Sequence, residues 1–222
     1  MKLIEHPDRE ALTLAVAQDI TETLGMALKT RDRAVLCLPG GSTPVPVFKA
    51  LAAARLEWDR VVVIPSDERW VPPDHARSNA RLIRRNLLEE GAGAELIELY
   101  AEGLDPEAGA AAASDRIAPL LPLSVLLLGM GEDMHVASLF PEAEGLAAAL
   151  DLAAPPVLPI RTAATDEPRV TLTRPALCSA TECFLMITGP EKRAALERAA
   201  ALPADQAPVA VLLKDAVVHY AE

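Results

Sequence analysis

The chain has 222 residues, a formal net charge of −11, and a composition that is 51% hydrophobic but only 3% aromatic. The apolar content predicts a folded chain rather than a disordered one. The negative charge disfavours a phosphate backbone as a partner, and the shortage of aromatic rings disfavours stacking on single-stranded nucleic acid. Because no apolar run approaches the length of a membrane span and the first residues lack a signal-peptide pattern, we expect a cytoplasmic protein without a membrane or nucleic-acid partner.

The cysteines and histidines show no metal-binding pattern. Cys37, Cys178 and Cys183 are an odd number without the spacing of metal ligands, so neither a disulfide framework nor a metal cluster is expected. Cys37 lies within an apolar run, where a thiol is expected to pack as a small hydrophobic group. Most of the four histidines are scattered along the chain, which argues against a zinc site.

Hydrophobic periodicity divides the chain into alternating strands and helices. Short apolar runs predict strands at 34–38, 60–65, 96–99, 125–128, 157–160, 170–173, 183–188, 209–213 and 217–220. Three- and four-residue apolar spacing predicts helices at 8–30, 47–51, 81–88, 105–118, 142–150 and 190–201. This alternation favours a mostly parallel sheet with helices on both faces. Since no composition break divides the chain, we expect one α/β domain over residues 1–222.

A glycine-rich loop, with Gly40, Gly41, Ser42 and Thr43, joins the strand at 34–38 to the next helix. The first N–H groups of a helix lack intrahelical partners and carry partial positive charge, so amides and hydroxyl groups at this junction can bind a phosphate. The alternative is a plain turn in which Ser42 or Thr43 caps the helix. The loop matches neither the Walker pattern nor the dinucleotide-binding pattern of glycines.

Charged residues directly follow the strand at 60–65. Asp67, Glu68 and Arg69 lie where open α/β sheets place their chemistry, beyond the carboxyl end of a buried strand. A solvated loop would also explain these charges. It explains less well why Trp70, one of only two tryptophans, lies among them.

An acid and a base follow the strand at 125–128. Gly129 ends the apolar run, Gly131 allows a sharp turn or a close approach to a ligand, and Asp133 and His135 come next. An ionisable pair beyond the end of a buried strand points to catalysis. The alternative is a histidine that caps an element or packs in the core, and this motif alone leaves the choice open.

Five segments, taken together and in this order, resemble the 6-phosphogluconolactonase family of the glucosamine/galactosamine-6-phosphate isomerase superfamily. They are Leu38–Pro44, Ser66–Pro72 with Ser78 and Asn79 beyond it, Gly129–Pro141, Arg169–Thr173 and Gly189–Lys192. The resemblance implies a Rossmann-like α/β sheet similar to that of glucosamine-6-phosphate deaminase and ribose-5-phosphate isomerase. It also implies hydrolysis of 6-phospho-D-glucono-1,5-lactone to 6-phosphogluconate in the oxidative pentose phosphate pathway, with no metal or cofactor.

The same resemblance implies roles for individual residues. His135 would be the general base, and Gly40–Thr43 would hold the phosphate of the sugar. Arg69 would contact the substrate or the developing oxyanion, while Lys192 and Arg169 would add positive charge to the phosphate site. We expect the partner to be a small phosphosugar lactone and the protein to be a monomer or a small homo-oligomer.

Lactone hydrolysis needs a group that activates water. A lactone is an ester, and an imidazole is suited to removing a proton from the attacking water. Asp133 or Asp67 could orient the ring and favour the imidazolium as it forms. Arg69 could stabilise the tetrahedral oxyanion. Because the chain has no Gly-x-Ser-x-Gly motif for a serine nucleophile, we expect direct hydrolysis assisted by His135.

Residue 134 departs from the family pattern, which usually has Asp-Gly-His where this chain has Asp133, Met134 and His135. A glycine there suggests a positive φ or a tight approach to the ligand, and a methionine would strain the first and crowd the second. A non-catalytic sugar-phosphate binder is therefore one alternative.

A second alternative is a sugar-phosphate isomerase or deaminase on the same fold. Related deaminases tend to follow the catalytic histidine with Asn-Glu-Pro, whereas Ser138–Pro141 stands here and favours the lactonase.

Overall fold

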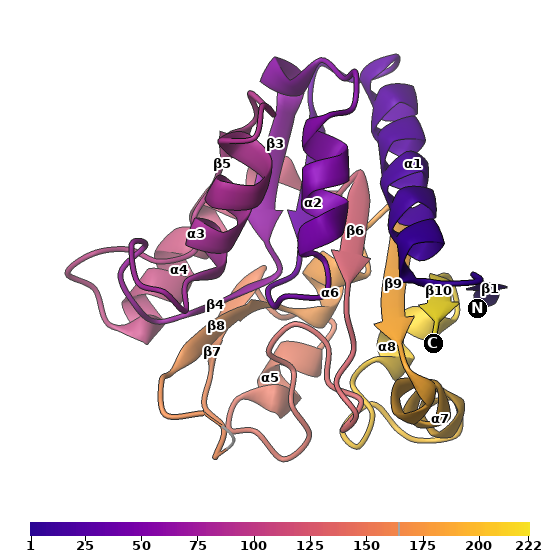
Figure 1. Ribbon diagram of the computed structural model, residues 1–222. Helices are drawn as coiled ribbons and strands as arrows, with labels where there is room; N and C mark the ends of the chain where they lie inside the picture. The colour runs from indigo at the N-terminus through magenta and orange to yellow at the C-terminus, as the bar shows by residue number, and fades with distance from the viewer. Residues whose placement is uncertain (164) are drawn as a thin grey trace.

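The computed structural model describes residues 1–163 and 165–222. A seven-stranded sheet runs through its centre in the order β1-β10-β9-β6-β2-β3-β5, and all its neighbouring strands are parallel. Its strands are β1 (Lys2–Glu5), β2 (Ala34–Leu38), β3 (Val61–Pro65), β5 (Glu95–Leu96), β6 (Val125–Leu128), β9 (Glu182–Thr188) and β10 (Val217–Ala221). The arrowheads of β3, β6 and β9 point the same way in Figure 1, so their carboxyl ends lie along one edge. The expected mostly parallel α/β sheet is confirmed.

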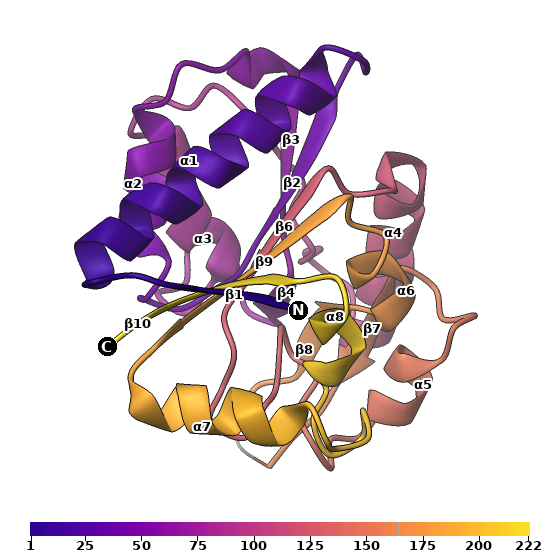
Figure 2. The same cartoon turned by 90° about the vertical axis from the view of Figure 1, so that its right-hand side faces the viewer.

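Helices cover both faces of this central sheet. They are α1 (Arg9–Leu28), α2 (Val45–Ala52), α3 (Asn79–Ile83), α4 (Pro106–Ile117), α5 (Leu146–Leu150), α6 (Arg174–Leu177), α7 (Pro190–Ala199) and α8 (Ala210–Leu213), and a π-helical segment (Arg84–Leu88) continues α3. Figure 2 shows α1, α2 and α3 on one side of the sheet and α4 and α6 on the other. Among the described residues, no helix combines the length and the apolar content needed to cross a membrane.

The central strands are apolar on both faces, which explains why they read as continuous hydrophobic runs. In β2, Leu36 packs into the core shared with α1 and α2, whereas Cys37 packs into the core shared with α4 and the neighbouring smaller sheet. Leu127 and Leu126 of β6 divide between the same two cores. Cys37 is fully buried, so the prediction that it packs as a small hydrophobic group is confirmed.

A second, three-stranded antiparallel sheet lies beyond the carboxyl ends of the central strands (Figure 1). It consists of β4 (Asp67–Arg69), β8 (Arg169–Leu172) and β7 (Val157–Ile160), in that order. The strands near 157–160 and 170–173 were expected, but a separate sheet was not. No helix lies between β7 and β8 among the described residues, and strands joined without a crossover helix pair antiparallel. The three-residue β4 carries too many charges to show a strand pattern.

The largest difference from the prediction lies at 209–213, where the expected strand is wrong. The run forms a short helix, α8, instead. Val209, Leu212 and Leu213 are buried at the three- and four-residue spacing of one helix face. The position beside β9 in the sheet is filled by β10. A short apolar run cannot by itself distinguish a buried strand from a buried helical turn.

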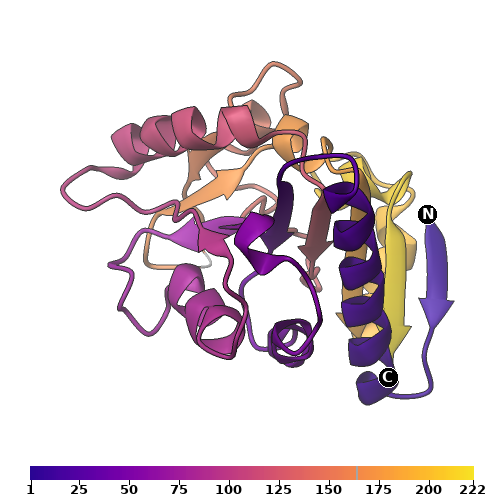
Figure 3. The same ribbon diagram turned by 90° about the horizontal axis from the view of Figure 1, so that it is seen from above.

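Smaller differences concern boundaries. Helix α5 begins at Leu146 rather than Glu142, because Glu142 and Gly145 have positive φ angles of 62° and 94° that a right-handed helix cannot accommodate. Strand β5 covers only Glu95–Leu96. Strand β1 was not expected, since it is a four-residue strand without alternation, in which only Ile4 is partly buried. Figure 3 shows β1 at this edge beside β10, its one neighbour in the sheet, with both termini on the same side of the molecule.

Candidate active site

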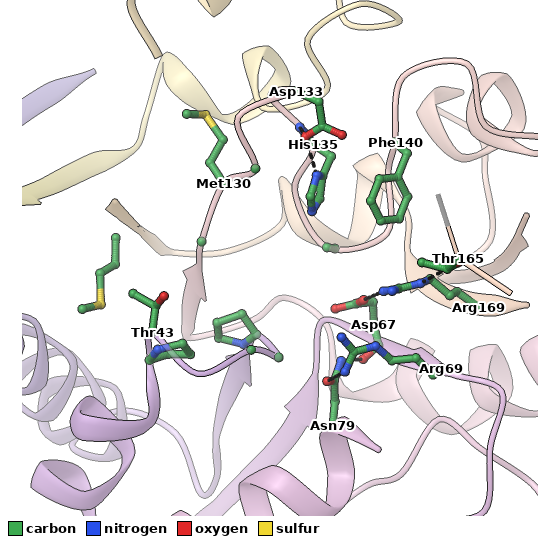
Figure 4. A pocket seen from close by; sticks show the side chains of 18 of the residues that line it. Thr43, Asp67, Arg69, Asn79, Met130, Asp133, His135, Phe140, Thr165 and Arg169 are labelled. Carbon is green, nitrogen blue, oxygen red and sulfur yellow. Dashed lines mark hydrogen bonds and ion pairs between the residues drawn. The ribbon is translucent and has the colours of Figure 1, made fainter. Parts of the chain in front are cut away.

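A cleft of about 470 Å³ opens where the carboxyl ends of the central strands meet the small antiparallel sheet (Figure 4). It is lined by Pro39, Gly40, Gly41, Thr43, Pro44, Asp67, Arg69, Asn79, Gly129, Met130, Gly131, Asp133, His135, Ala137, Phe140, Thr165, Arg169, Met186 and Lys192. Nine of the ten residues that the sequence predicts for the site are among them, and only Ser42 is not. Open α/β sheets bind ligands beyond the carboxyl ends of their strands, so the cleft lies where the sequence places the chemistry.

The glycine loop between β2 and α2 forms one wall of the cleft. Gly41 has a φ of +90°, a conformation that favours glycine. A Cβ on Gly40 would overlap the side-chain amide of Asn79. The chain therefore needs glycine at position 40 for the close approach of its own Asn79, whether or not a ligand also binds there.

The hydroxyl groups of this loop do not cap α2. Pro44 occupies the cap position and no side chain accepts a hydrogen bond from the start of the helix, so the alternative that Ser42 or Thr43 caps it is wrong. Thr43 lines the cleft (Figure 4). Ser42 does not line it, although both side chains are exposed. Phosphate binding by the loop stays a prediction.

Asp133 and His135 form a hydrogen-bonded pair at the opposite wall. Nδ1 of His135 lies 2.5 Å from Oδ1 of Asp133, which leaves the other side of the ring facing the cleft (Figure 4). The bond to His135 holds the pKa of Asp133 below its usual value. An ionised carboxylate at this position favours the tautomer with the proton on Nδ1, so Nε2 is free to accept a proton. Of the two carboxylates expected near the ring, Asp133 is the one that contacts it.

Two neighbouring residues, Phe140 and Gly131, lie against this pair. The ring of Phe140 packs against the imidazole of His135, with centroids 4.2 Å apart. A Cβ on Gly131 would overlap both Nδ1 of His135 and Oδ1 of Asp133. The expected close approach at Gly131 is therefore made by the chain's own acid–base pair.

Met134, between the two members of the pair, has a φ of 66°, which is one of the two possibilities that a family glycine suggests. Its side chain packs against the core shared with α4 and does not line the cleft. Its carbonyl accepts a hydrogen bond from the N–H of Val209 at 3.1 Å. The methionine thus carries a left-handed backbone that costs about 1–2 kcal/mol, without crowding the cleft.

Asp67, Ser138 and Arg169 form a buried polar network at the cleft floor. Ser138 Oγ donates to Oδ2 of Asp67 at 2.6 Å, while Arg169 Nη1 lies 3.3 Å from Ser138 Oγ and 3.5 Å from the same Oδ2. Ser66 Oγ donates to the other carboxylate oxygen, Oδ1, at 2.9 Å. Burial lowers the pKa of the Arg169 guanidinium, and the charge of Asp67 opposes that shift. The carboxylate of Asp67 therefore holds Arg169 and not the imidazole of His135.

Arg69 is held at the cleft by Asn79. Arg69 Nη1 donates to Oδ1 of Asn79 at 2.6 Å and to the carbonyl of Arg77 at 3.0 Å. Asn79 Nδ2 in turn donates to the carbonyl of Asp67 at 2.8 Å. Because Asn79 also lies against Gly40, one amide side chain connects the arginine, strand β4 and the glycine loop.

The carboxylate of Glu68 anchors the start of α3 behind Arg69. It accepts hydrogen bonds from the N–H groups of Arg69, Asn79 and Ala80 at 2.7–2.9 Å and from Ser78 Oγ at 3.0 Å. Burial raises the pKa of Glu68, and these bonds oppose the shift. Glu68 does not line the cleft, so its part in the site is to fix the segment that presents Asn79.

Lys192 brings a further positive charge to the cleft from the first turn of α7. No carboxylate among the described residues forms an ion pair with it, in contrast to Arg169. Its ammonium group is therefore available to an anion in the cleft. Within residues 1–163 and 165–222, no group of three or more His, Cys, Asp or Glu side chains is placed to hold a metal ion.

Sequence reasoning missed several residues that line or support the cleft. They are Asn79, Ser138, Phe140 and Thr165. Asn79 and Ser138 belong to segments that carry the family resemblance, but no spacing rule assigns them a role. Their contacts join segments far apart in the chain, and a single sequence carries no signal of such pairing.

The fold and the cleft together define a Rossmann-like α/β protein with an acid–base pair and cationic side chains at the carboxyl edge of its sheet. A family model described as glucosamine-6-phosphate isomerases/6-phosphogluconolactonase matches residues 7–220. The chain belongs to this family.

Individual relatives agree with this assignment. A 6-phosphogluconolactonase from Pseudomonas putida is 40% identical over 203 residues, which cover 90% of this chain and 84% of the relative. A crystal structure of a 6-phosphogluconolactonase from Shewanella baltica OS155 has a TM-score of 0.95 at 29% identity and covers 100% of this chain and 98% of that one. A monomeric glucosamine-6-phosphate deaminase, 17% identical, shares the fold with a TM-score of 0.83 over 100% of this chain and 98% of its own. The resemblance and the fold class inferred from the sequence are confirmed.

Proposed function

We propose that this protein is a carboxylic ester hydrolase that opens 6-phospho-D-glucono-1,5-lactone to 6-phosphogluconate. The observation that supports this most is a single cleft in which Nε2 of His135 faces the cationic side chains of the small sheet and the glycine loop. Relatives at about 40% identity carry the name of this activity. We place the reaction in the cytoplasm, in the oxidative branch of the pentose phosphate pathway.

His135 is the general base of the proposed reaction. Nε2 removes a proton from water as the water oxygen bonds to the lactone carbonyl carbon. The resulting imidazolium is stabilised by Asp133, whose carboxylate already accepts the Nδ1 proton. When the tetrahedral intermediate collapses, the bond between the carbonyl carbon and the ring oxygen breaks, and the proton on Nε2 passes to that oxygen. Water, imidazole and fixed charges supply every proton and charge that the step needs.

The cations divide between the two ends of the substrate. Arg69, held by Asn79, faces the developing oxyanion, where a fixed donor contributes most to acyl transfer. The amides of Gly40–Thr43 and the ammonium group of Lys192 bind the phosphate. Arg169 adds positive charge to the phosphate side, and its ion pair with Asp67 keeps the guanidinium in place.

A lactonase assay tests the proposal. Freshly prepared 6-phosphogluconolactone is hydrolysed with and without the protein, and the acid released is titrated at constant pH to subtract spontaneous ring opening. We expect a rate well above the background that saturates with substrate. Ammonia release from glucosamine 6-phosphate is measured in parallel, and release without lactone hydrolysis would favour a deaminase. Binding of 6-phosphogluconate without hydrolysis, with turnover restored by Met134→Gly, would favour a non-catalytic binder.

A further inference from the structure

The proposed base and two of the proposed cations, Arg69 and Arg169, come from different sheets. His135 lies in the loop after β6 of the central sheet, whereas β4 and β8 of the small sheet carry Arg69 and Arg169. The antiparallel register places Arg69 opposite Arg169 and Asp67 opposite Thr171, so β4 and β8 fix the cations relative to one another. The distance from the imidazole to this set of charges must be set by contacts between the two sheets.

Ser138 makes polar contacts across this junction. It follows His135 by three residues, and its hydroxyl group donates to Asp67 at 2.6 Å while it accepts from Arg169 at 3.3 Å. Its N–H donates to Thr171 Oγ1 at 3.2 Å. One residue of the histidine loop is thus bonded to both strands that present the cations, and its side chain is fully buried.

Two neighbours of Ser138 show that its placement matters to the imidazole. Ala137, just before it, has a φ of 50°, a conformation that persists only where surrounding contacts enforce it. Phe140, just beyond it, packs on the ring of His135 and lies beneath the guanidinium of Arg169, with 5.3 Å from Cζ to the ring centroid. A shift of Ser138 would therefore move the ring that supports the base.

We propose that Ser138 is a positioning residue for the reaction: its bonds to Asp67, Arg169 and Thr171 set the distance between His135 and the cationic side of the cleft. The inference deepens the proposed lactonase function and rests on it for its kinetic consequence. Reacting groups need placement within a fraction of an ångström, and a shift of about 1 Å can cost up to about 100-fold in rate. Without the hydroxyl group, the guanidinium and the carboxylate can approach each other directly, and the histidine loop loses its bond to them.

Ser66 provides a matched control. Like Ser138, Ser66 is fully buried and donates its hydroxyl proton to Asp67. It differs in that it donates to Oδ1 and directly precedes Asp67 in the chain. Ser66→Ala therefore removes a hydrogen bond to the same carboxylate without touching the histidine loop. Thr171→Val gives a second, independent variant, because it removes the acceptor for the Ser138 N–H and leaves the serine hydroxyl group unchanged.

The experiment compares the parent protein with Ser138→Ala, Thr171→Val and Ser66→Ala. Turnover is normalised to the folded fraction from far-UV circular dichroism. The imidazole resonance of His135, identified by its loss in His135→Ala, is followed by NMR through a pH titration. We expect kcat to fall about tenfold in Ser138→Ala and several-fold in Thr171→Val, with less than threefold change in KM, and to stay within twofold in Ser66→Ala. The His135 resonance should shift in the first two variants only, because it senses the ring of Phe140.

The two readouts separate the inference from the function. A parent protein without lactonase turnover would overturn the proposed function, and the NMR comparison would then decide whether Ser138 places the imidazole. An unchanged His135 resonance in both Ser138→Ala and Thr171→Val would overturn the inference, even in an active enzyme. Equal losses of turnover in Ser138→Ala and Ser66→Ala would also overturn it, because they would show a general effect on Asp67.

Discussion

The loops of the central sheet and the strands of the small sheet both contribute functional groups to the cleft, but they position these groups in different ways. The loops place their groups through backbone conformations and close approaches, as at Gly41, Gly131 and Met134. The small sheet places Arg69 and Arg169 through strand register and buried polar bonds. A local backbone requirement can be recognised from a short stretch of sequence, whereas strand register and long-range hydrogen bonds cannot. The difference predicts that changes in the loop after β6 act on the base, and that changes at the contacts of the small sheet act on the charges around it.

Removing the base should have the largest effect. In His135→Ala we expect kcat to fall by roughly 100-fold or more, with little change in KM, because the cations of the small sheet remain in place. Steady-state lactone hydrolysis, corrected for the spontaneous rate, measures the change. His75→Ala is the control, since His75 is exposed and does not line the cleft. Hydrolysis by His135→Ala at the parent rate would show that another group takes the proton.

A methyl group at Gly131 should act almost as strongly, although it removes no functional group. The added Cβ overlaps both members of the acid–base pair, so the pair must separate and kcat should fall about 30- to 100-fold. Gly129→Ala is the matched control in the same loop, because its Cβ would lie 3.9 Å from the nearest atom, the carbonyl oxygen of Met186. We expect at least a tenfold smaller loss there. Equal losses in the two variants would contradict the role given to Gly131.

The far edge of the central sheet should respond to acid independently of the cleft. Burial lowers the pKa of His219 to about 4, and nearby His6 and Lys2 act in the same direction. An unfolded histidine titrates near 6.5, so the unfolded chain binds more protons between pH 6.5 and 4 and stability falls as the pH falls through that window. We expect a loss of about 2 kcal/mol, measured as urea midpoints at pH 7, 5 and 4. A flat profile in the parent, or one unchanged in His219→Gln, would contradict this.

Gly40→Ala should show that a loop glycine can act on a charge of the small sheet. Its Cβ overlaps Asn79, which holds Arg69, so we expect kcat/KM to fall about tenfold. Asn79→Ala removes both the clash and the hydrogen bond. The double variant should therefore be no worse than Asn79→Ala alone, because the two changes act through one contact. Full additivity of the two losses would mean that Gly40 serves the ligand directly.

Met134→Gly should have the smallest effect. Glycine relieves the left-handed backbone but loses the packing of the methionine side chain, so the free energy of unfolding should change by less than about 1 kcal/mol. Because Met134 does not line the cleft, kcat should stay within about threefold of the parent value. Urea denaturation and the lactone assay measure the two quantities. A large gain in turnover would show that the methionine impairs the acid–base pair.

Much of the fold and most of the candidate site follow from the sequence. The buried strands and the long helices show clear periodicity. The segments after 34–38, 60–65 and 125–128 contain seven of the nine predicted site residues that line the cleft, and Arg169 and Lys192 are the other two. The separate antiparallel sheet, the helix at 209–213 and strand β1 could not be predicted, because short runs are ambiguous until their partners are known.

The choice between Asp67 and Asp133 as the partner of the imidazole shows the same limit. Each carboxylate lies shortly after a buried strand, so the order of residues does not distinguish the two. The structure decides between them. Gly131 leaves room for Asp133 to reach His135, whereas Asp67 accepts a hydrogen bond from Ser138. Neither contact is visible in the order of the residues.

The position of β1 has a consequence for how the molecule assembles during synthesis. Residues 2–5 are made long before residues 217–221, which form the strand that pairs with them. A pairing between such distant segments has a high contact order, so this edge can close only after residues 217–221 have left the ribosome. Until then β1 has no partner strand in the sheet.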